Sequence, residues 1–180
     1  MLGVLQLQYY WFGMKHAIEE YIKKCEVCSR WKASTTKPPL IPIIAERKNE
    51  RWLIDFSELE TDSLGMKWML LLIDSFSKYI WGTSFATKEA INVAQFVFET
   101  ILREGKPSKL QHDNGGEFIA KVLQDQLSAF GITDVRIAPY SPNVDGQIER
   151  PNGTIKKKLG ILVEQLKLPW SQCLQFAISQ

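Results

Sequence analysis

The sequence predicts an α/β layer fold with a mixed central sheet. Three strand-like runs follow one another between residues 51 and 85, separated by turn residues, which is typical of an antiparallel meander. After residue 88, stretches with helical spacing alternate with short strand-like stretches. A meander followed by alternating helices and strands favours one mixed sheet covered by helices.

The composition is ordinary for a globular protein and excludes few functions. Of 180 residues, 45% are hydrophobic and 23% are charged, and no apolar run is long enough to span a bilayer. The first residues lack the basic lead of a signal peptide. Three cysteines do not make a disulfide framework, which favours a reducing compartment. The net charge of +2 is weakly informative, so the positions of the charges must decide whether nucleic acid is bound.

Residues 9 to 32 are expected to form a helix that runs into a Cys-x-x-Cys pair. Ile18, Ile22 and Cys25 follow one another at helical steps, and Cys28 completes the pair. Next comes a proline-rich stretch, "ASTTKPPLIPII", whose missing amides and restricted dihedral angles favour a linker. The expected domains are therefore residues 1–33, a linker over residues 34–49, and a larger domain over residues 50–180.

The larger domain is expected to contain five strands and at least three helices. Asp62, Ser63 and Gly65 predict the first turn of the meander. Gly105 and Pro107 stop one helix, and Gly131 stops another. In order, the elements are the strands "RWLIDFSEL", "KWMLLLIDSF" and "KYIWGTSF", a helix over residues 88–103, the strand "SKLQHD", the helix "EFIAKVLQDQLSAFG", the strand "DVRIA" and a helix from about residue 148.

Three acidic residues stand in contexts that suggest catalysis. Asp55 lies in an apolar strand, Asp113 precedes Asn114 and two glycines, and Glu149 follows a loop that contains Pro139, Pro142 and Gly146. Consecutive glycines let a bulky partner approach the main chain, and 35 residues separate Asp113 from Glu149. An aspartate at a strand end is more often a turn former, which is what we expect of Asp74.

The helix expected from about residue 148 has two distinct faces. At 100° per residue its apolar side chains fall within about 60° of arc, and a second stripe lies about 110° away. Glycines in this stripe would let a polynucleotide lie close to the helix, whereas a solvated face is the alternative interpretation of its lysines. The apolar face consists of Ile148, Ile155, Leu159, Leu162 and Leu166, and the second stripe of Glu149, Gly153, Lys156 and Gly160.

Converging carboxylates would require a counter-charge. Like charges near 4 Å apart repel by roughly 1 to 4 kcal/mol per pair. Hard divalent cations remove this repulsion, since Mg²⁺ prefers oxygen ligands and two such ions serve displacement at phosphorus. If Asp55, Asp113 and Glu149 converge in the fold, such ions would make the cluster tolerable and could serve a reaction at phosphorus.

Four segments of the chain resemble the integrase core of retroviruses and LTR retrotransposons. They are "WLIDFSEL", "LLLIDSFSKYIWG", "GKPSKLQHDNGGEF" and "APYSPNVDGQIERPNGTIKKKL", and they follow the family's order and its D,D-35-E spacing over about residues 48–180. The resemblance implies a ribonuclease H-like, three-layer fold with a five-stranded mixed sheet flanked by helices. It also implies DNA integration, in which the enzyme cleaves near a DNA end and joins the 3′ hydroxyl to target DNA.

The same resemblance implies roles for individual residues. Asp55, Asp113 and Glu149 would be catalytic ligands of two Mg²⁺ or Mn²⁺ ions. The expected partners are DNA, both element ends and target, and further copies of the chain, with no membrane. The expected location is the nucleus, or otherwise the cytoplasm. The residues that would contact DNA are Asn114, Tyr140, Asn143, Gln147, Gly153, Lys156 and Lys157.

Cys25 and Cys28 gain an interpretation from this family. Related integrases hold one structural zinc with an upstream histidine pair and a Cys-x-x-Cys pair. His16 is too close to Cys25 to be the family's second histidine, so the chain is expected to begin inside this zinc module. Zn²⁺ would then bind only if a histidine pair is present upstream. Two ordinary thiols remain the alternative, and a thioredoxin-like site is disfavoured because no strand precedes the pair.

Two other functions remain open from the sequence. One is a catalytically inactive, host-adopted or decayed integrase domain that binds DNA or protein. The other is a ribonuclease H-type nuclease, which would share the metal chemistry but normally lacks the lysine-bearing helix.

Pro151 is compatible with that helix only if the helix begins near residues 148 to 150. His112 is expected to pack or to face solvent rather than to bind a metal.

Overall fold

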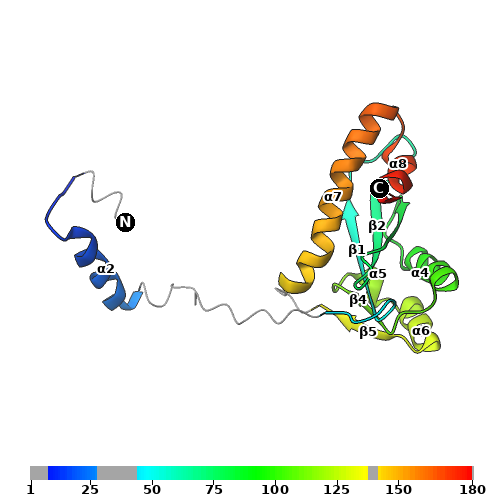
Figure 1. The fold of residues 1–180 in the computed structure, drawn as a ribbon, viewed down its shortest axis with the longest axis horizontal. Coiled ribbons are helices and arrows are strands. Elements are labelled where there is room, and N and C mark those ends of the chain that lie inside the picture. The colour runs from blue at the N-terminus through cyan, green and yellow to red at the C-terminus, as the bar shows by residue number, and fades with distance from the viewer. Residues whose placement is uncertain (1–7, 28–43, 138–141, 180) are drawn as a thin grey trace. The chain divides into compact units, whose positions relative to one another are not determined.

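The computed structural model describes residues 8–27, 44–137 and 142–179, with only the backbone described for residues 142–146. The chain divides into two compact units, Met1–Leu40 and Ile41–Gln180 (Figure 1). None of the described helices is long and apolar enough to cross a membrane.

In the first unit, α2 spans Met14–Lys24, and Glu26 and Val27 are also helical. This helix is shorter than the sequence predicted, because Gly13 adopts a left-handed conformation with φ of 77° and the helix begins after it. Cys25 ends the helix in an extended conformation, and its amide donates to the carbonyl of Ile22. The expectation of helix from residue 9 was therefore wrong.

The second unit is built on a five-stranded mixed sheet, as predicted. β1 (Arg51–Glu58), β2 (Trp68–Asp74) and β3 (Ile80–Phe85) form an antiparallel meander. β4 (Lys109–His112) and β5 (Thr133–Arg136) continue the sheet as strands parallel to β1, giving the order β3-β2-β1-β4-β5.

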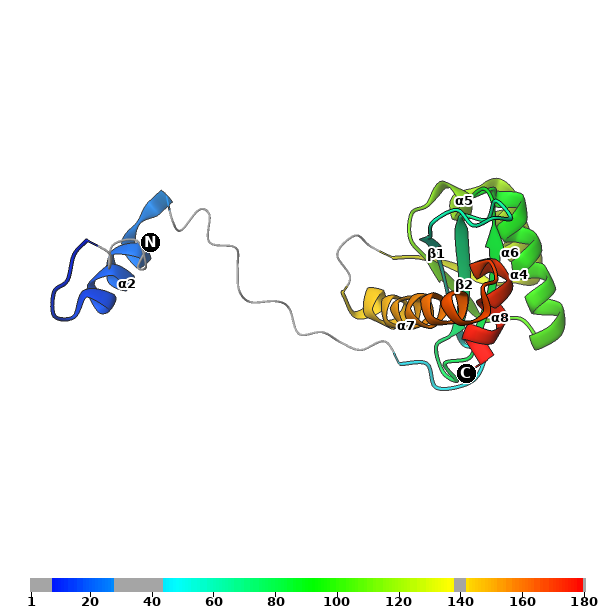
Figure 2. The same ribbon diagram turned by 90° about the horizontal axis from the view of Figure 1, so that it is seen from above.

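Helices cover both faces of this sheet, which gives the expected three layers (Figure 2). Ala90–Glu104 (α4), Gly116–Ile119 (α5) and Lys121–Phe130 (α6) lie on one face, and Pro142–Leu166 (α7) and Trp170–Ser179 (α8) lie on the other. Alternate residues of β2 point into the two cores. Leu70 and Leu72 face α4 and α6, whereas Met69 and Leu71 face α7 and α8.

The helices on the first face differ from their sequence predictions in two ways. The predicted helix over residues 117–131 is two helices, since Ala120 is extended with ψ of 142°. Helical spacing predicts that α4 buries a face made of Ile91, Ala94, Val97, Phe98 and Ile101. In the structure Ile91 and Phe98 are exposed and Val93 and Thr100 are buried, so this predicted face was partly wrong.

Helix α7 begins at Pro142, six residues earlier than expected, and contains Pro151 in its interior. Residues 138–141 of the expected loop lie outside the described part of the chain, and Gly146 belongs to the helix rather than to a loop. Pro151 removes a single amide donor, a loss that the packing of Ile155 and Leu159 against the sheet offsets. The expectation that α7 must start near Pro151 was wrong.

Candidate active site

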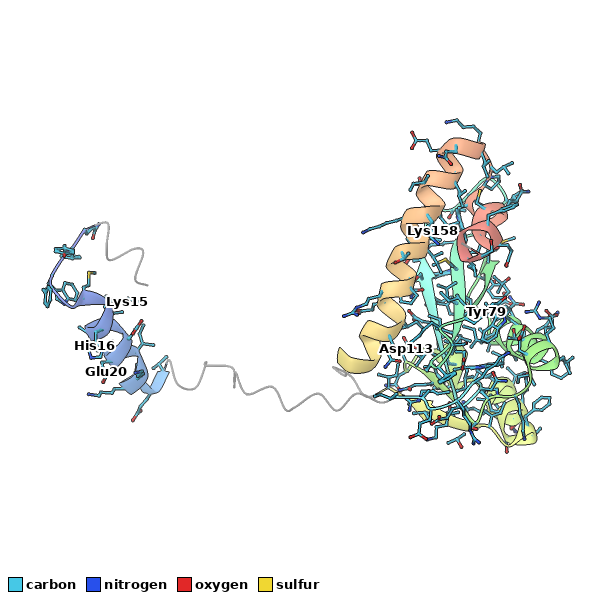
Figure 3. The ribbon with its side chains drawn as sticks, in the orientation of Figure 1. Lys15, His16, Glu20, Tyr79, Asp113 and Lys158 are labelled. Atoms are coloured by element: carbon cyan, nitrogen blue, oxygen red, sulfur yellow. The ribbon has the colours of Figure 1, made fainter. Side chains whose placement is uncertain are left out.

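Asp55 and Asp113 are brought together by the parallel pairing of β1 and β4. Leu53 pairs with Gln111 in this ladder, so extending the register by two residues places Asp113 opposite Asp55. Neighbouring strands lie about 4.8 Å apart, and residues in the same register share a face of the sheet. Asp113, which is labelled in Figure 3, follows directly after β4 and is exposed. Asp55 is half-buried.

The pair raises the pKa of one carboxylate. Burial and, next in size, the charge of Asp113 raise the pKa of Asp55 from 3.8 to about 6. Hydrogen bonds from the amide of Phe56 and from Asn152, together with the charge of Lys88, lower it by less. The site therefore resists two negative charges in the absence of a counter-ion.

Asn152 connects α7 to this pair. Its Nδ2 donates to Oδ2 of Asp55 at 2.8 Å, although 97 residues separate the two in sequence. Asn152 is 7% exposed, and its Oδ1 is buried without a hydrogen-bond partner among the described residues. A buried amide oxygen without a partner, beside two carboxylates, is a donor set suited to a hydrated cation.

The turn after Asp113 explains one of its two glycines. The amide of Gly115 donates to Oδ1 of Asp113 at 2.9 Å. A Cβ on Gly115 would lie 2.9 Å from Oε2 of Glu117 and 3.0 Å from Oδ1 of Asp113, so a side chain would displace these carboxylates. A Cβ on Gly116 would meet open space. A side chain at position 115 would require these flexible carboxylate groups to move, whereas one at position 116 would meet no neighbour within 4 Å.

His112 supports the strand end from within the core. Its ring is fully buried, stacks on Phe118 and lies between the carboxylate of Asp134 and the main-chain carbonyl of Asp113. The expectation that His112 packs rather than binds a metal agrees with this position. Because it holds the carbonyl of Asp113, it fixes the direction in which the chain leaves β4.

Glu149 does not join the two aspartates in this structure. It is exposed on α7, three residues before Asn152, so the two side chains project from the same side of the helix. Within the described ranges, no three His, Cys, Asp or Glu side chains lie close enough together to hold a metal ion. The structure thus places Glu149 one helical turn from a residue that contacts Asp55.

The expected DNA-contacting residues fall into three groups. Asn114, Gly153, Lys156 and Lys157 are exposed, and Nζ of Lys156 lies 3.4 Å from the carbonyl oxygen of Glu58. Gln147 is half-buried. Tyr140 and the side chain of Asn143 lie outside the described residues. Cys28, which was predicted as a zinc ligand, also lies outside them.

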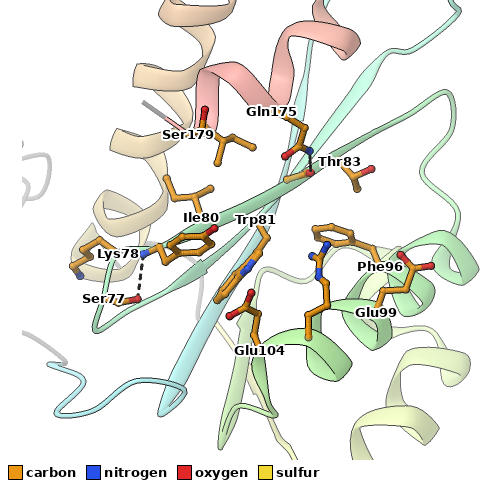
Figure 4. Close-up of a pocket in the computed structure, with 14 residues that line it drawn as sticks. Ser77, Lys78, Ile80, Trp81, Thr83, Phe96, Glu99, Glu104, Gln175 and Ser179 are labelled. Atoms are coloured by element: carbon orange, nitrogen blue, oxygen red, sulfur yellow. Dashed lines mark hydrogen bonds between the residues drawn. The ribbon is translucent and has the colours of Figure 1, made fainter.

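The outer edge of β3 carries a groove of about 780 Å³ that lies apart from the acidic pair (Figure 4). α4 and α8 form its walls, and Nε2 of Gln175 donates to the carbonyl of Gly82 at 2.7 Å. None of the predicted catalytic residues lines it. The carboxylate geometry, rather than the size of a cavity, therefore identifies the candidate site.

Comparison with protein families decides the classification of the chain. Residues 45–142 match the integrase core domain, and residues 1–34 match the integrase zinc binding domain. The chain belongs to the integrase core family. This is a family of DDE-type polynucleotidyl transferases with a ribonuclease H-like fold.

Relatives of this integrase core occur in retroviral polyproteins. The chain is 34% identical over 149 residues to the Gag-Pol polyprotein of Koala retrovirus and 33% identical over 149 residues to that of Gibbon ape leukemia virus. Each alignment covers 82% of this chain and 9% of the polyprotein. The chain therefore spans less than a tenth of the length of these relatives.

Two solved structures share the fold. One is a simian T-cell lymphotropic virus intasome in complex with PP2A regulatory subunit B56 gamma, with a TM-score of 0.74, 21% identity, and coverage of 98% of this chain and 62% of that chain. The other is the catalytic core domain of BIV integrase, with a TM-score of 0.62, 21% identity, and coverage of 72% and 81%. The expected fold class is thus confirmed.

Sequence reasoning missed two supports of this integrase core. Asn152 stands three residues after Glu149, and this helical spacing indicates that the two side chains project from the same side of the helix. Asp134 could not have been assigned to His112, because their contact depends on the parallel pairing of β4 with β5.

Proposed function

We propose that this chain is the catalytic part of an enzyme that integrates the DNA of a retrovirus-like element, by metal-dependent processing of 3′ ends and strand transfer. The observation that carries the proposal is the Asp55 and Asp113 pair, in which burial and a like charge raise the pKa of Asp55 to about 6. Such a pair is stabilised in its ionised form by a divalent cation.

Asp55, Asp113 and Glu149 would hold two Mg²⁺ or Mn²⁺ ions. The unpartnered Oδ1 of Asn152 supports this fit, since it can accept a hydrogen bond from water bound to an ion. When bound, the ions supply activation of the attacking oxygen and stabilisation of the leaving oxygen at phosphorus. Glu149 would complete the set by a change of side-chain rotamer, because it already lies one turn from Asn152.

The exposed stripe of α7 would contact DNA. Gly153 leaves room for a backbone, and Lys156 and Lys157 supply positive charge on the same exposed part of the helix. Asn114 would contact DNA from the turn after Asp113, and Tyr140, Asn143 and Gln147 from the start of α7 and the segment before it. Both the DNA ends of the element and the target DNA are proposed substrates, with assembly into a homo-oligomer in the nucleus.

Cys25 and Cys28 would supply two thiolates to a structural zinc, and a histidine pair would supply the other two ligands. The match of residues 1–34 to the integrase zinc binding domain supports this assignment. In a longer chain that carries the upstream histidine pair, removal of zinc by a chelator should unfold the first unit and leave the second unit folded.

A DNA-binding or protein-binding module without catalytic activity is the second candidate. The observation that favours it is that Glu149 does not group with the two aspartates among the described residues. The two functions differ in whether DNA strands are joined or only retained.

Strand transfer by the full 180-residue chain with Mg²⁺ and a short DNA duplex separates these functions. Asp113→Asn should lower the rate about a thousandfold, since a metal ligand is lost, whereas Asp125→Asn on the exposed side of α6 should leave the rate unchanged. Retention of DNA without joining supports the binding module, and nicking of RNA in a hybrid supports a nuclease. Full activity of Asp113→Asn would remove the assignment.

A further inference from the structure

A further carboxylate lies beside the turn that carries Asp113. Oε2 of Glu117 and Oδ1 of Asp113 approach each other across Gly115, since both lie within 3.0 Å of the point where a Cβ on Gly115 would stand. The side chain of Glu117 is 11% exposed. A divalent cation bound by Asp113 would therefore meet Glu117 as a competing oxygen ligand.

Lys88 neutralises this carboxylate. Its Nζ lies 3.2 Å from Oε1 of Glu117, and the lysine side chain is 34% exposed. The charge of Lys88 also lowers the pKa of Asp55, which shows that the ammonium group lies within electrostatic reach of the aspartate pair. It forms its ion pair with Glu117 rather than with Asp55 or Asp113 in the described part of the chain.

Two aromatic rings hold the ammonium group in this position. Nζ of Lys88 lies 4.3 Å from the ring centroid of Trp68 and 5.1 Å from that of Phe56. Phe56 follows Asp55 on β1, so the two side chains lie on opposite faces of the sheet. The cation–π contacts therefore keep Lys88 on the face opposite Asp55, from which it reaches Glu117.

We propose that Lys88 is a positioning residue that withholds Glu117 from the metal site, so that divalent cations bind Asp55 and Asp113 without a misplaced ligand. This inference rests on the proposed function, because it assumes that the aspartate pair binds metal. In this proposal Lys88 and Glu117 determine which oxygen ligands surround the cation, and neither residue acts by contacting DNA.

Mn²⁺ binding to the full chain, measured by electron paramagnetic resonance of the free ion, tests the proposal. Lys88→Met should bind Mn²⁺ about fivefold more tightly than wild type, since Glu117 then adds an uncompensated charge near the cation. The double variant Lys88→Met with Glu117→Gln should return to within about twofold of wild type, and Lys88→Arg should retain wild-type affinity.

Lys67 provides the matched control. Its Nζ lies 5.3 Å from the same Trp68 ring and 2.9 Å from Oε1 of Glu58, so it has the same kinds of contact with a different carboxylate. Lys67→Met should leave Mn²⁺ affinity unchanged. Thermal unfolding of each variant, followed by circular dichroism, reports whether its fold is retained.

The outcomes separate the inference from the proposed function. Unchanged or weaker Mn²⁺ binding by Lys88→Met, or tight binding that persists in the double variant, overturns the inference alone. Should Lys88→Met not fold, Lys88→Gln takes its place with the same expected tightening of about fivefold, and unchanged or weaker Mn²⁺ binding by that variant overturns the inference. Absence of Mn²⁺ binding by the wild type overturns the inference together with the proposed function.

Discussion

Asp55 and Asp74 occupy neighbouring strands of one sheet and have opposite surroundings. Asp74, at the end of β2, is fully buried, and its carboxylate accepts hydrogen bonds from the amide of Asn49 at 3.1 Å and from the amide and hydroxyl of Ser77 at 2.9 and 2.6 Å. Asp55, on β1, is less buried, accepts from Asn152 and lies opposite Asp113.

The difference shows how donors determine the role of a carboxylate. Asp74 receives donors from its own turn and from Asn49, two residues before β1, so its charge is satisfied within the fold. Asp55 lacks a comparable set and faces a like charge, which raises its pKa to about 6. Asp74 therefore stabilises the fold, as its position at a strand end predicted, whereas Asp55 destabilises the metal-free fold at neutral pH.

Replacement of Asp74 should have the largest effect on the free energy of unfolding. Asp74→Ala leaves the amides of Asn49 and Ser77 without their acceptor in a buried position, so the free energy of unfolding should fall by about 3 kcal/mol. Chemical denaturation of wild type and variant measures this change. An equal change in Asp125→Asn, an exposed carboxylate on α6, would contradict the comparison.

Replacement of Asp55 should change the free energy of unfolding in the opposite direction. Asp55→Asn removes a charge that the metal-free fold disfavours, so the free energy of unfolding at pH 7 should rise by about 2 kcal/mol in the presence of a chelator. Denaturation at pH 7 provides the measurement. A decrease in stability would show that Asp55, like Asp74, supports the fold.

Acidification should produce a smaller gain in the wild type. The pKa of Asp55 is about 6 in the folded state, above its ordinary value of 3.8. Between these values the folded state binds a proton that the unfolded state does not bind, so the contribution of Asp55 to stability rises as pH falls through 6 and is complete below about 4. From pH 7 to pH 5 this gain should be about 1 kcal/mol.

Other carboxylates also titrate in this range, so the difference between wild type and Asp55→Asn isolates the effect. The stability advantage of Asp55→Asn at pH 7 should shrink toward zero near pH 4. A constant difference across this range would show that the pKa of Asp55 is not raised.

The smallest effect concerns the hydrogen bond from α7. Asn152→Ala removes a donor to the ionised form of Asp55, so the pKa of Asp55 should rise further, by about half a unit. The free energy of unfolding should change by less than about 1 kcal/mol, because the unpartnered Oδ1 is removed as well. The shift of the midpoint in the pH dependence of stability checks this prediction.

Local sequence patterns predicted the sheet and the aspartate pair. They failed for helix boundaries, which long-range packing determines. β1, β2 and β3 follow apolar runs and turn residues, and Asp55 and Asp113 stand at recognisable strand positions. The break between α5 and α6 at Ala120 is not marked by a glycine or proline in the sequence, because it results from the packing of these two helices against the sheet. Pro151 misled the prediction, since tertiary contacts of α7 offset the lost hydrogen bond.

The residues that support the candidate site could be identified only from the folded structure. Asn152 and Asp55 are 97 residues apart, and no local pattern pairs an asparagine on a helix with an aspartate on a strand. The contact of Lys88 with Glu117 likewise depends on how the start of α4 approaches the turn after β4. The sequence therefore indicated which carboxylates to examine but not how their charges are balanced.

The most direct measurement is a carbon-13 NMR titration of the carboxyl group of Asp55, with and without Mg²⁺. Without the ion, Asp55 should titrate near pH 6, and Mg²⁺ should move its midpoint below 5, since the cation stabilises the ionised pair. A midpoint near the ordinary value of 3.8 without metal, or one that Mg²⁺ leaves in place, would contradict a cation-binding site at Asp55 and Asp113.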